Sequence, residues 1–209
     1  MEVELISITP DAEKLIERAG RTSHLSFERE GESTESRFIK MIIKMGHHSV
    51  LEHAYATFRV RGVSRALTHQ LVRHRLCSYT QQSQRYVSES NFDYVEPQSI
   101  KNNNETHHLF KEFMERAKGI YCRLQELGIK NEDARLVLPT AVCTEIVITA
   151  NFREWRHIIE LRGAPGAQWE IRQMAVRILQ ILKKHVPSVF FDFKIDEKEK
   201  VVTQSQCLL

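Results

Sequence analysis

The chain has 209 residues with a formal net charge of +3, and 42% of its residues are hydrophobic. This size fits one domain with an ordinary hydrophobic core, and so small a net charge argues against a general polyanion-binding protein. The four cysteines form no CxxC pair, the N-terminus has no signal-peptide pattern and no apolar run is long enough to span a membrane, so we expect a soluble protein of the reducing cytoplasm.

The first expected elements are a strand and two helices. Residues 3–8 alternate apolar and polar side chains, which predicts a strand. Pro10 favours the start of a helix, which is expected over 11–19. Ser33 can cap a second helix, which is expected to end at Gly46. The apolar positions of this second helix are Phe38, Ile42 and Met45.

The next segment is expected to be a strand, a helix and a loop. Residues 54–63 alternate again and predict a strand with one polar face. Ser64 can cap a helix from Arg65 to about Arg75, whereas 76–85 lacks helical periodicity and is expected to be a loop.

The second half is expected to be mainly helical. A long amphipathic helix over 104–127 is predicted to end at Gly128, with an apolar side made of Phe110, Phe113, Ala117, Ile120 and Leu124. A buried strand over 142–149 precedes a helix capped by Asn151 that runs to about Leu161.

A last helix is expected over 167–185, with Ile171, Ala175, Ile178 and Leu182 facing inward, followed by a short strand over 189–193. We therefore predict one α+β domain over residues 1–193, with a mixed or antiparallel sheet packed by long helices. Residues 194–209 are charged, then polar, and are predicted to be a poorly ordered tail.

An arginine cluster is the strongest functional signal. Between His53 and Ser88 the chain has no Asp, Glu or Lys but six arginines. The guanidinium is a planar fork that matches phosphates and carboxylates two bonds at a time, and the Ser, Thr and Gln residues after Arg75 add neutral hydrogen-bonding groups. A pocket for an anionic ligand, a solvated basic face and a nucleic-acid patch all fit this pattern.

On the expected helix the polar side chains point in different directions. Gln70 and Arg73 are three residues apart and share a face, whereas Arg73 and Arg75 lie roughly 200° apart around a helix. The two arginines then serve two ligands, or one large ligand and a site across a subunit boundary. His74 follows Leu71 by three residues and is either a buried core residue or a ligand contact.

No standard metal or nucleotide motif is present. The histidines of the segment 46–53 have neither HExxH nor HxxEH spacing, so we expect no metal site. GxGxxG and GxxxxGK[ST] are absent as well, so a nucleotide would have to be held by side chains. Asn151 has a capping or a ligand role, and Arg162 at a helix end either complements the helix dipole or binds a ligand.

Several motifs, taken in order, resemble one family. Arg73-His74-Arg75-x-x-Ser78-x-x-x-x-Ser83 matches the RHRxxSxxxxS signature of the flavin-dependent thymidylate synthases. Further segments similar to that family occur in order, so the resemblance covers roughly residues 19 to 193. They are Gly46-His47-x-Ser49-x-x-Glu52-His53, Ala134-Arg135-x-Val137-Leu138-Pro139, Asn151-x-Arg153, Leu161-Arg162 and Ala167-Gln168-Trp169-Glu170.

The resemblance implies reductive methylation of dUMP to dTMP, with methylenetetrahydrofolate as carbon donor and FAD, reduced by NADPH, as hydride source. It also implies a homotetramer with active sites at subunit interfaces, without a membrane or specific nucleic-acid partner. Arg162 is the implied catalytic residue. The implied FAD contacts are His47, Ser49, Arg73, His74, Arg75, Gln81, Asn151, Arg153 and His157. The implied dUMP contacts are Gln70, Arg73, Gln81, Gln82, Ser83, Gln84, Arg85, Arg135 and Arg162.

Two positions depart from the family pattern. Gln81 stands where many members have an acid, and Gly166 stands where some have a histidine. Cys77 and Ser83 are the candidate nucleophiles near the arginine motif, but we expect neither to attack the pyrimidine. Cys77 occupies a variable position of the signature, and no acid lies near Ser83 in sequence to orient a base. An RNA-binding protein and a flavin reductase without methyl transfer remain the alternatives.

Overall fold

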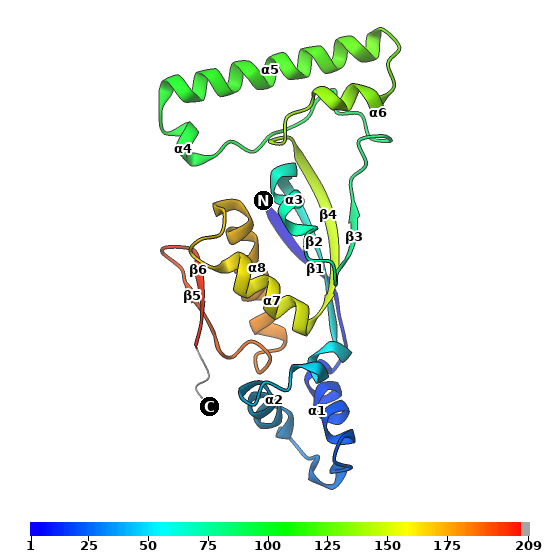
Figure 1. Ribbon diagram of the computed structural model, residues 1–209, viewed down its shortest axis with the longest axis vertical. Coiled ribbons are helices and arrows are strands. Elements are labelled where there is room, and N and C mark those ends of the chain that lie inside the picture. The colour runs from blue at the N-terminus through cyan, green and yellow to red at the C-terminus, as the bar shows by residue number, and fades with distance from the viewer. Residues whose placement is uncertain (206–209) are drawn as a thin grey trace. The chain divides into compact units, whose positions relative to one another are not determined.

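Residues 1–205 are described by a computed structural model, in which helices accompany two sheets (Figure 1). The first sheet has the strand order β1-β2-β4-β3, and the second pairs β5 with β6 in antiparallel register, Phe193 opposite Gln204. The strands are β1 Glu2–Ile8, β2 Tyr55–Ser64, β3 Ser78–Gln81, β4 Cys143–Asn151, β5 Phe193–Asp196 and β6 Val201–Gln204. The α+β class is confirmed.

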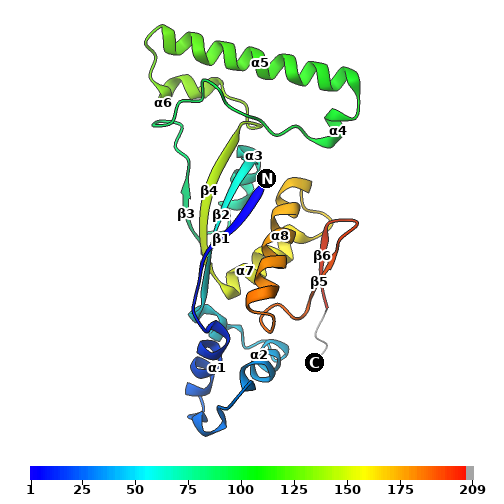
Figure 2. The same ribbon diagram turned by 180° about the vertical axis from the view of Figure 1, so that it is seen from behind.

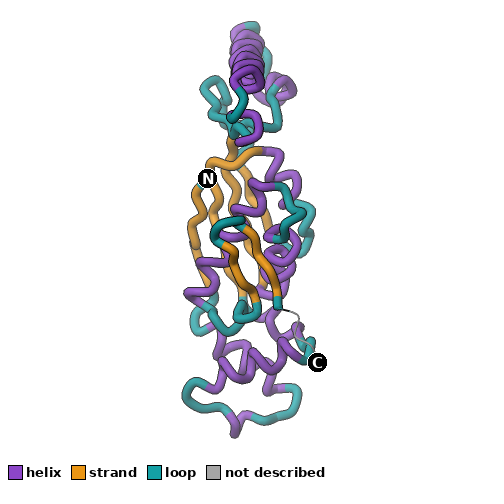
Figure 3. The backbone as a smooth tube through the Cα atoms, turned by 90° about the vertical axis from the view of Figure 1, so that its left-hand side faces the viewer, coloured by secondary structure: helices purple, strands orange, loops and turns teal. Residues whose placement is uncertain are grey.

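The α-helices of the described part are α1 Ala12–Thr22, α2 Thr34–Lys44, α3 Arg65–Leu71, α4 Gln98–Lys101, α5 Asn104–Glu126, α6 Asn131–Ala134, α7 Phe152–Gly163 and α8 Trp169–His185. Three short 3₁₀ helices accompany them: η1 Phe27–Arg29, η2 His48–His53 and η3 Arg135–Val137. Figure 3 shows these helices and strands by colour along the backbone.

The chain forms two compact units. Unit 1 consists of residues 1–2, 60–71 and 80–147, and unit 2 consists of 3–59, 72–79 and the chain from 148 onward. The strands β2 and β4 contribute residues to both units. The units are therefore interleaved along the sequence and are not separated by a linker.

The core of unit 2 is built around α7 and α8. The four residues predicted to face inward on α8, namely Ile171, Ala175, Ile178 and Leu182, are fully buried, which confirms that helix face. Trp155 of α7 packs edge-on against Phe58 of β2 with ring centroids 5.1 Å apart, and its indole N–H donates to the Ala56 carbonyl at 3.0 Å. The aromatic pair and this hydrogen bond fix α7 against the strand.

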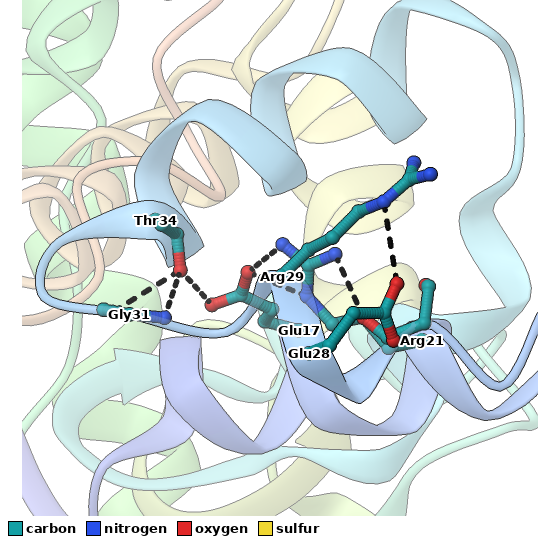
Figure 4. A network of polar contacts seen from close by, with 7 residues as sticks. Glu17, Arg21, Glu28, Arg29, Gly31 and Thr34 are labelled. Atoms are coloured by element: carbon teal, nitrogen blue, oxygen red, sulfur yellow. Dashed lines mark hydrogen bonds and ion pairs between the residues drawn. The ribbon is translucent and has the colours of Figure 1, made fainter.

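A polar network joins α1 to the start of α2 in unit 2 (Figure 4). Glu17 is buried, and its Oε1 accepts a hydrogen bond from Arg21 Nε at 2.9 Å. Its Oε2 accepts from the Thr34 hydroxyl at 3.0 Å, and that hydroxyl also accepts from the Gly31 backbone N–H at 3.1 Å. The carboxylate is thus satisfied on both oxygens, as a buried charge requires.

In unit 1, α5 covers only part of the apolar side predicted for it, where Ala117 is buried and Phe110 packs on the core. Met114, Ala117 and Tyr121 are buried, whereas Phe113 is 56% and Ile120 43% exposed. The Tyr121 hydroxyl accepts from the Glu89 backbone N–H at 3.1 Å, so this side of α5 also provides the hydrogen-bond acceptor for a backbone N–H of the preceding loop. A helix with apolar residues on two sides does not show from periodicity which side is covered.

The helix expected from Arg65 to about Arg75 is shorter. Ser64 caps it as predicted, because its Oγ accepts from the Leu67 N–H at 3.0 Å, but α3 ends at Leu71. The His74 carbonyl is engaged outside a helical pattern, accepting from the Tyr79 hydroxyl at 2.9 Å and the Cys77 N–H at 3.3 Å. Arg73 and Arg75 therefore lie in a turn, and the helical angle between them does not apply.

The loop expected over 76–85 contains strand β3. Its polar side chains hide the usual apolar alternation, because Gln81 Nε2 donates to the hydroxyls of Thr68 at 3.0 Å and Thr144 at 3.2 Å. In α2 the buried residues are Ile39, Ile42 and Ile43, so of the expected apolar positions Ile42 is buried, whereas Met45 is 52% exposed.

The C-terminal predictions also need correction. Residues 189–193 are mainly turn, and the strand begins only at Phe193. The predicted poorly ordered tail instead forms the β5–β6 hairpin up to Gln204, which lies alongside α7 and α8 in both views (Figures 1 and 2), while residues 206–209 lie outside the described part. The Asp192 carboxylate anchors the hairpin, since it accepts from both Arg156 Nη atoms at 2.7 Å and from Gln204 Nε2 at 2.8 Å.

Candidate active site

Helix α7 carries much of the predicted site. Asn151 caps it, because its Oδ1 accepts from the Glu154 N–H at 2.9 Å, so the capping role is confirmed. The helix buries Phe152, Trp155, Ile158 and Ile159, and this burial leaves Arg153 and His157 exposed one turn apart. Arg162 lies half-buried in its last turn.

A cavity of about 530 Å³ lies along the exposed side of α7 in unit 2. Its wall includes Asn151, Arg153 and His157 from the predicted FAD set. It also includes His48, Glu52 and Gln204, which the sequence prediction did not assign. Arg153 Nη1 donates to Glu52 Oε1 at 2.5 Å. Two larger cavities, of about 650 and 640 Å³, adjoin α2, but no residue of the predicted site lines them.

The cavity has donors that fit part of a flavin nucleotide. Imidazole, amide and guanidinium groups suit ring carbonyls and phosphates, and the volume is within the roughly 300–1,000 Å³ of small-molecule sites. The nearby Glu52 carboxylate is paired with Arg153, so its charge is offset.

His74 and Arg162 are brought together from distant parts of the chain. Arg162 Nε donates to His74 Nε2 at 3.0 Å, although the residues are 88 positions apart. His74 is 5% exposed, and its ring meets that of His157 edge-on at 5.5 Å between centroids. The buried Glu154 places Oε1 3.4 Å from His74 Nδ1.

The ionisation of this group follows from its burial. Desolvation, with the charges of Arg162 and His157, lowers the pKa of His74 to about 4, so the ring is neutral at pH 7. The His74–Glu154 approach is therefore a polar contact of a neutral imidazole and not an ion pair. Burial raises the pKa of Glu154, partly opposed by His157.

The remaining FAD candidates divide by unit. Arg73 and Arg75 are exposed in the turn after α3, and His47 and Ser49 are exposed at the start of η2, all in unit 2. Gln81, which was assigned to both ligands, belongs to unit 1.

Most dUMP candidates belong to unit 1, and two of its arginines meet at one residue. Arg85 Nε donates to the Glu132 carboxylate at 2.9 Å, and Arg135 Nε donates to the Glu132 carbonyl at 3.1 Å. The other unit 1 candidates are Gln70, Gln81, Gln82, Ser83 and Gln84, whereas Arg73 and Arg162 belong to unit 2. The structure therefore brings Arg85 and Arg135 together at Glu132.

The segment between His53 and Ser88 has no acidic residue in its sequence, but acidic side chains from other segments lie next to it in the fold. Arg59 lies 3.9 Å from Glu4, and Arg61 lies 2.5 Å from Glu2, both glutamates being on β1. These two arginines thus belong to a solvated face of ion pairs. The ligand interpretation applies to the later arginines of the cluster.

The sequence prediction missed Glu154 and Gln204. An acid three residues after the capping Asn151 is typical of a helix start, which concealed the contact of Glu154 with His74. Gln204 lies in the segment predicted to be a poorly ordered tail. Within residues 1–205, no group of three or more His, Cys, Asp or Glu side chains is placed to hold a metal ion, and no helix there has the length and apolar character of a membrane span.

Comparison with known proteins identifies the family of the chain. The model of the thymidylate synthase complementing protein family matches residues 4–188. The chain is 41% identical over 200 residues to a flavin-dependent thymidylate synthase of Geobacter sulfurreducens, covering 92% of this chain and 86% of that protein. It is 44% identical over 174 residues to one of Pyrococcus furiosus, covering 81% and 71% of the two chains.

A flavin-dependent thymidylate synthase of Nitratidesulfovibrio vulgaris is 41% identical over 208 residues, covering 90% of this chain and 84% of that protein. The chain belongs to the flavin-dependent thymidylate synthase family, and the family and enzyme predictions are confirmed.

Proposed function

We propose that the protein makes dTMP from dUMP by reductive methylation, with methylenetetrahydrofolate as carbon donor and FAD, reduced by NADPH, as hydride source. Family membership over residues 4–188 is the observation that carries this proposal. The name that these relatives carry, flavin-dependent thymidylate synthase, supports both a flavin and a thymidylate product.

Arg162 is the proposed catalytic residue. For C5 of the uracil to become nucleophilic, negative charge has to be tolerated on the N3, O2 and O4 edge of the ring. A guanidinium held in place stabilises such charge as it develops, without reorganising during the reaction. The hydrogen bond from Arg162 Nε to the buried His74 supports this role, because it restricts the plane of the guanidinium.

The flavin is proposed to bind along the exposed side of α7. The residues that would hold it are His47, Ser49, Arg73, His74, Arg75, Gln81, Asn151, Arg153 and His157. When bound and reduced, the flavin would supply the hydride. The cavity beside Asn151, Arg153 and His157 supports their part in binding, whereas His74 contributes mainly through Arg162 because its ring is buried.

The nucleotide is proposed to bind through Gln70, Arg73, Gln81, Gln82, Ser83, Gln84, Arg85, Arg135 and Arg162. The meeting of Arg85 and Arg135 at Glu132 supports a site for the dUMP phosphate, because two guanidinium groups can share one phosphate.

A homotetramer with active sites at subunit interfaces is also proposed. The outer side of α5 in unit 1 supports a subunit contact there. Leu109, Phe113 and Ile120 are 66%, 56% and 43% exposed, and Leu127 just beyond the helix is 62% exposed. These residues recur at four- and seven-residue spacing, and an exposed apolar stripe of this kind is typical of a helix covered by another chain.

The test is reconstitution with defined components. Purified protein is incubated with FAD, NADPH, methylenetetrahydrofolate and dUMP, and dTMP is measured by chromatography while each component is omitted in turn. We expect dTMP only in the complete mixture. NADPH oxidation without dTMP would instead indicate a flavin reductase, and absence of flavin binding would contradict the proposal.

Arg162→Ala should lower turnover roughly 10²–10³-fold, as the loss of one donor to a developing oxyanion does. Its stability should fall by no more than about 1–3 kcal/mol, because Arg162 is half-buried but its loss leaves the buried His74 Nε2 without this donor. Near-normal turnover at saturating dUMP would restrict Arg162 to structural roles, namely the helix dipole and the hydrogen bond to His74.

A further inference from the structure

Glu154 is buried where a surface carboxylate would serve the helix equally well. It lies in the first turn of α7, where an acid complements the helix dipole, yet it is only 6% exposed. Burying a carboxylate costs free energy unless a specific partner compensates. The approach of its Oε1 to His74 Nδ1, at 3.4 Å, is such a contact.

The hydrogen on His74 follows from its two neighbours. An arginine N–H can only donate, so the Arg162 bond at 3.0 Å makes His74 Nε2 an acceptor. A neutral imidazole carries one N–H, which must then be on Nδ1. Glu154 Oε1, which can only accept when the carboxyl is ionised, lies 3.4 Å from that nitrogen.

We propose that Glu154 is a positioning residue for Arg162: its carboxylate holds His74 as the Nδ1–H tautomer, and His74 Nε2 in turn holds the guanidinium. The catalytic part of this inference depends on the proposed function, in which Arg162 acts on the pyrimidine. In the opposite tautomer two N–H groups would face each other, and the guanidinium would turn away from His74. The neutral state of His74 at pH 7 agrees with this arrangement.

Two substitutions separate positioning from packing or helix-dipole effects. Glu154→Gln keeps an oxygen that can accept from Nδ1–H, whereas Glu154→Leu keeps the bulk without an acceptor. Glu35→Leu removes a first-turn acid from α2 and is the matched control, because Glu35 lies outside the proposed site. Each Glu154 variant is made in the wild type and in Arg162→Ala.

Turnover is measured at saturating dUMP. Glu154→Leu should lower kcat about 10- to 100-fold, as the loss of an outer partner of a functional histidine does in metal sites. Glu154→Gln should stay within about threefold of wild type because it keeps an oxygen that can accept from His74 Nδ1–H. In the Arg162→Ala background, Glu154→Leu should lower kcat by less than about twofold more, since the effects of residues that act through each other are not additive. Glu35→Leu should leave kcat unchanged.

Two kinetic results would overturn the inference. One is an equal loss from Glu154→Leu in both backgrounds, which would mean that Glu154 does not act through Arg162. The other is equal damage by Gln and Leu, which would mean that the acceptor is irrelevant.

A second readout does not depend on activity. Histidine is labelled with ¹⁵N, and the His74 signal is assigned by its loss in His74→Gln. We expect a neutral ring with the hydrogen on Nδ1 that does not titrate between pH 5.5 and 8, kept in Glu154→Gln and replaced by a tautomer mixture in Glu154→Leu. Hydrogen on Nε2 in the wild type would refute the tautomer assignment. If the wild type makes no dTMP, the proposed function fails, while these spectra still decide the tautomer.

Discussion

Removal of the Asp192 carboxylate tests how the C-terminal hairpin is fixed to α7. Asp192 and Arg156 form a two-pronged ion pair, with side chains only 2% and 6% exposed. In Asp192→Ala the guanidinium stays buried and keeps the Val189 carbonyl as a hydrogen-bond acceptor, at 2.5 Å. Gln204 Nε2 loses the partner that it has in the wild type at 2.8 Å.

Breaking a buried pair on one side costs about 3–5 kcal/mol, because an uncompensated charge is left behind. For a chain of this length each kcal/mol lowers the melting temperature by about 2–4 °C, so Asp192→Ala should melt roughly 6–20 °C lower. Replacing both partners, in Asp192→Leu with Arg156→Met, should recover most of the loss, since two apolar side chains leave no buried charge.

The assay is urea unfolding and thermal melting, with Asp196→Ala as the control. Asp196 is exposed on the same hairpin and accepts from the backbone N–H groups of Lys198 and Glu199, so its loss should cost about 1 kcal/mol. A loss below about 1 kcal/mol in Asp192→Ala, or a double variant as unstable as the single one, would refute this explanation.

The pair also predicts a pH dependence. Burial alone would raise the pKa of Asp192, but the hydrogen bonds and charge of Arg156, with the hydrogen bond from Gln204, hold it below the ordinary value. A lowered folded-state pKa contributes stability that is complete above the unfolded pKa, about 4, and is lost as the pH falls through the folded-state pKa. The stability difference between wild type and Asp192→Asn should therefore be constant from pH 5 to 8 and shrink below about pH 4. A difference that persists unchanged in acid would contradict the assignment.

Three further substitutions have distinct expected outcomes. Burial raises the pKa of Cys77 to about 11, which leaves roughly one thiol in a thousand ionised at pH 8. Cys77→Ala should therefore keep most dTMP synthesis, and the wild-type thiol should react slowly with thiol reagents. A covalent Cys77–pyrimidine adduct in mass spectrometry would overturn this. Ser83→Ala should raise the KM for dUMP by about 10- to 100-fold, the value of a hydrogen bond to a charged group, with a smaller change in kcat; a selective loss of kcat would assign the hydroxyl to the chemistry. Gly163→Ala would place a Cβ 2.7 Å from Val202 Cβ and should cost about 1–3 kcal/mol in urea unfolding. Changing Val202 to Ala as well should recover only part of this loss, because alanine keeps the Cβ. No loss in Gly163→Ala would mean that β6 moves away from α7 at little cost.

The sequence predicted the elements whose signals are local. The inward side of α8 follows from apolar spacing alone, and Asn151 and Ser64 cap their helices as their positions predicted. Each of these signals lies within a single helix and the residue before it. The family resemblance supplied the candidate ligand residues, which residue spacing alone left open.

The failures have in common that their causes are distant in sequence. Strand β3 shows no apolar alternation because Gln81 is satisfied by hydroxyls, one of them on Thr144, 63 positions later. The hairpin looks like a polar tail until Asp192 is placed against Arg156, 36 positions earlier. Glu154 has the local pattern of a helix start, and only the fold shows that it meets His74.

The position of the hairpin in the sequence has a consequence during synthesis. Residues 193–204 leave the ribosome after α7 and α8, because the chain emerges from its N-terminus onward and folds as it does so. Arg156 therefore emerges well before Asp192 and Gln204, and until then its guanidinium must remain hydrated. Helix α7 can take its final packing against β6 only after this delay.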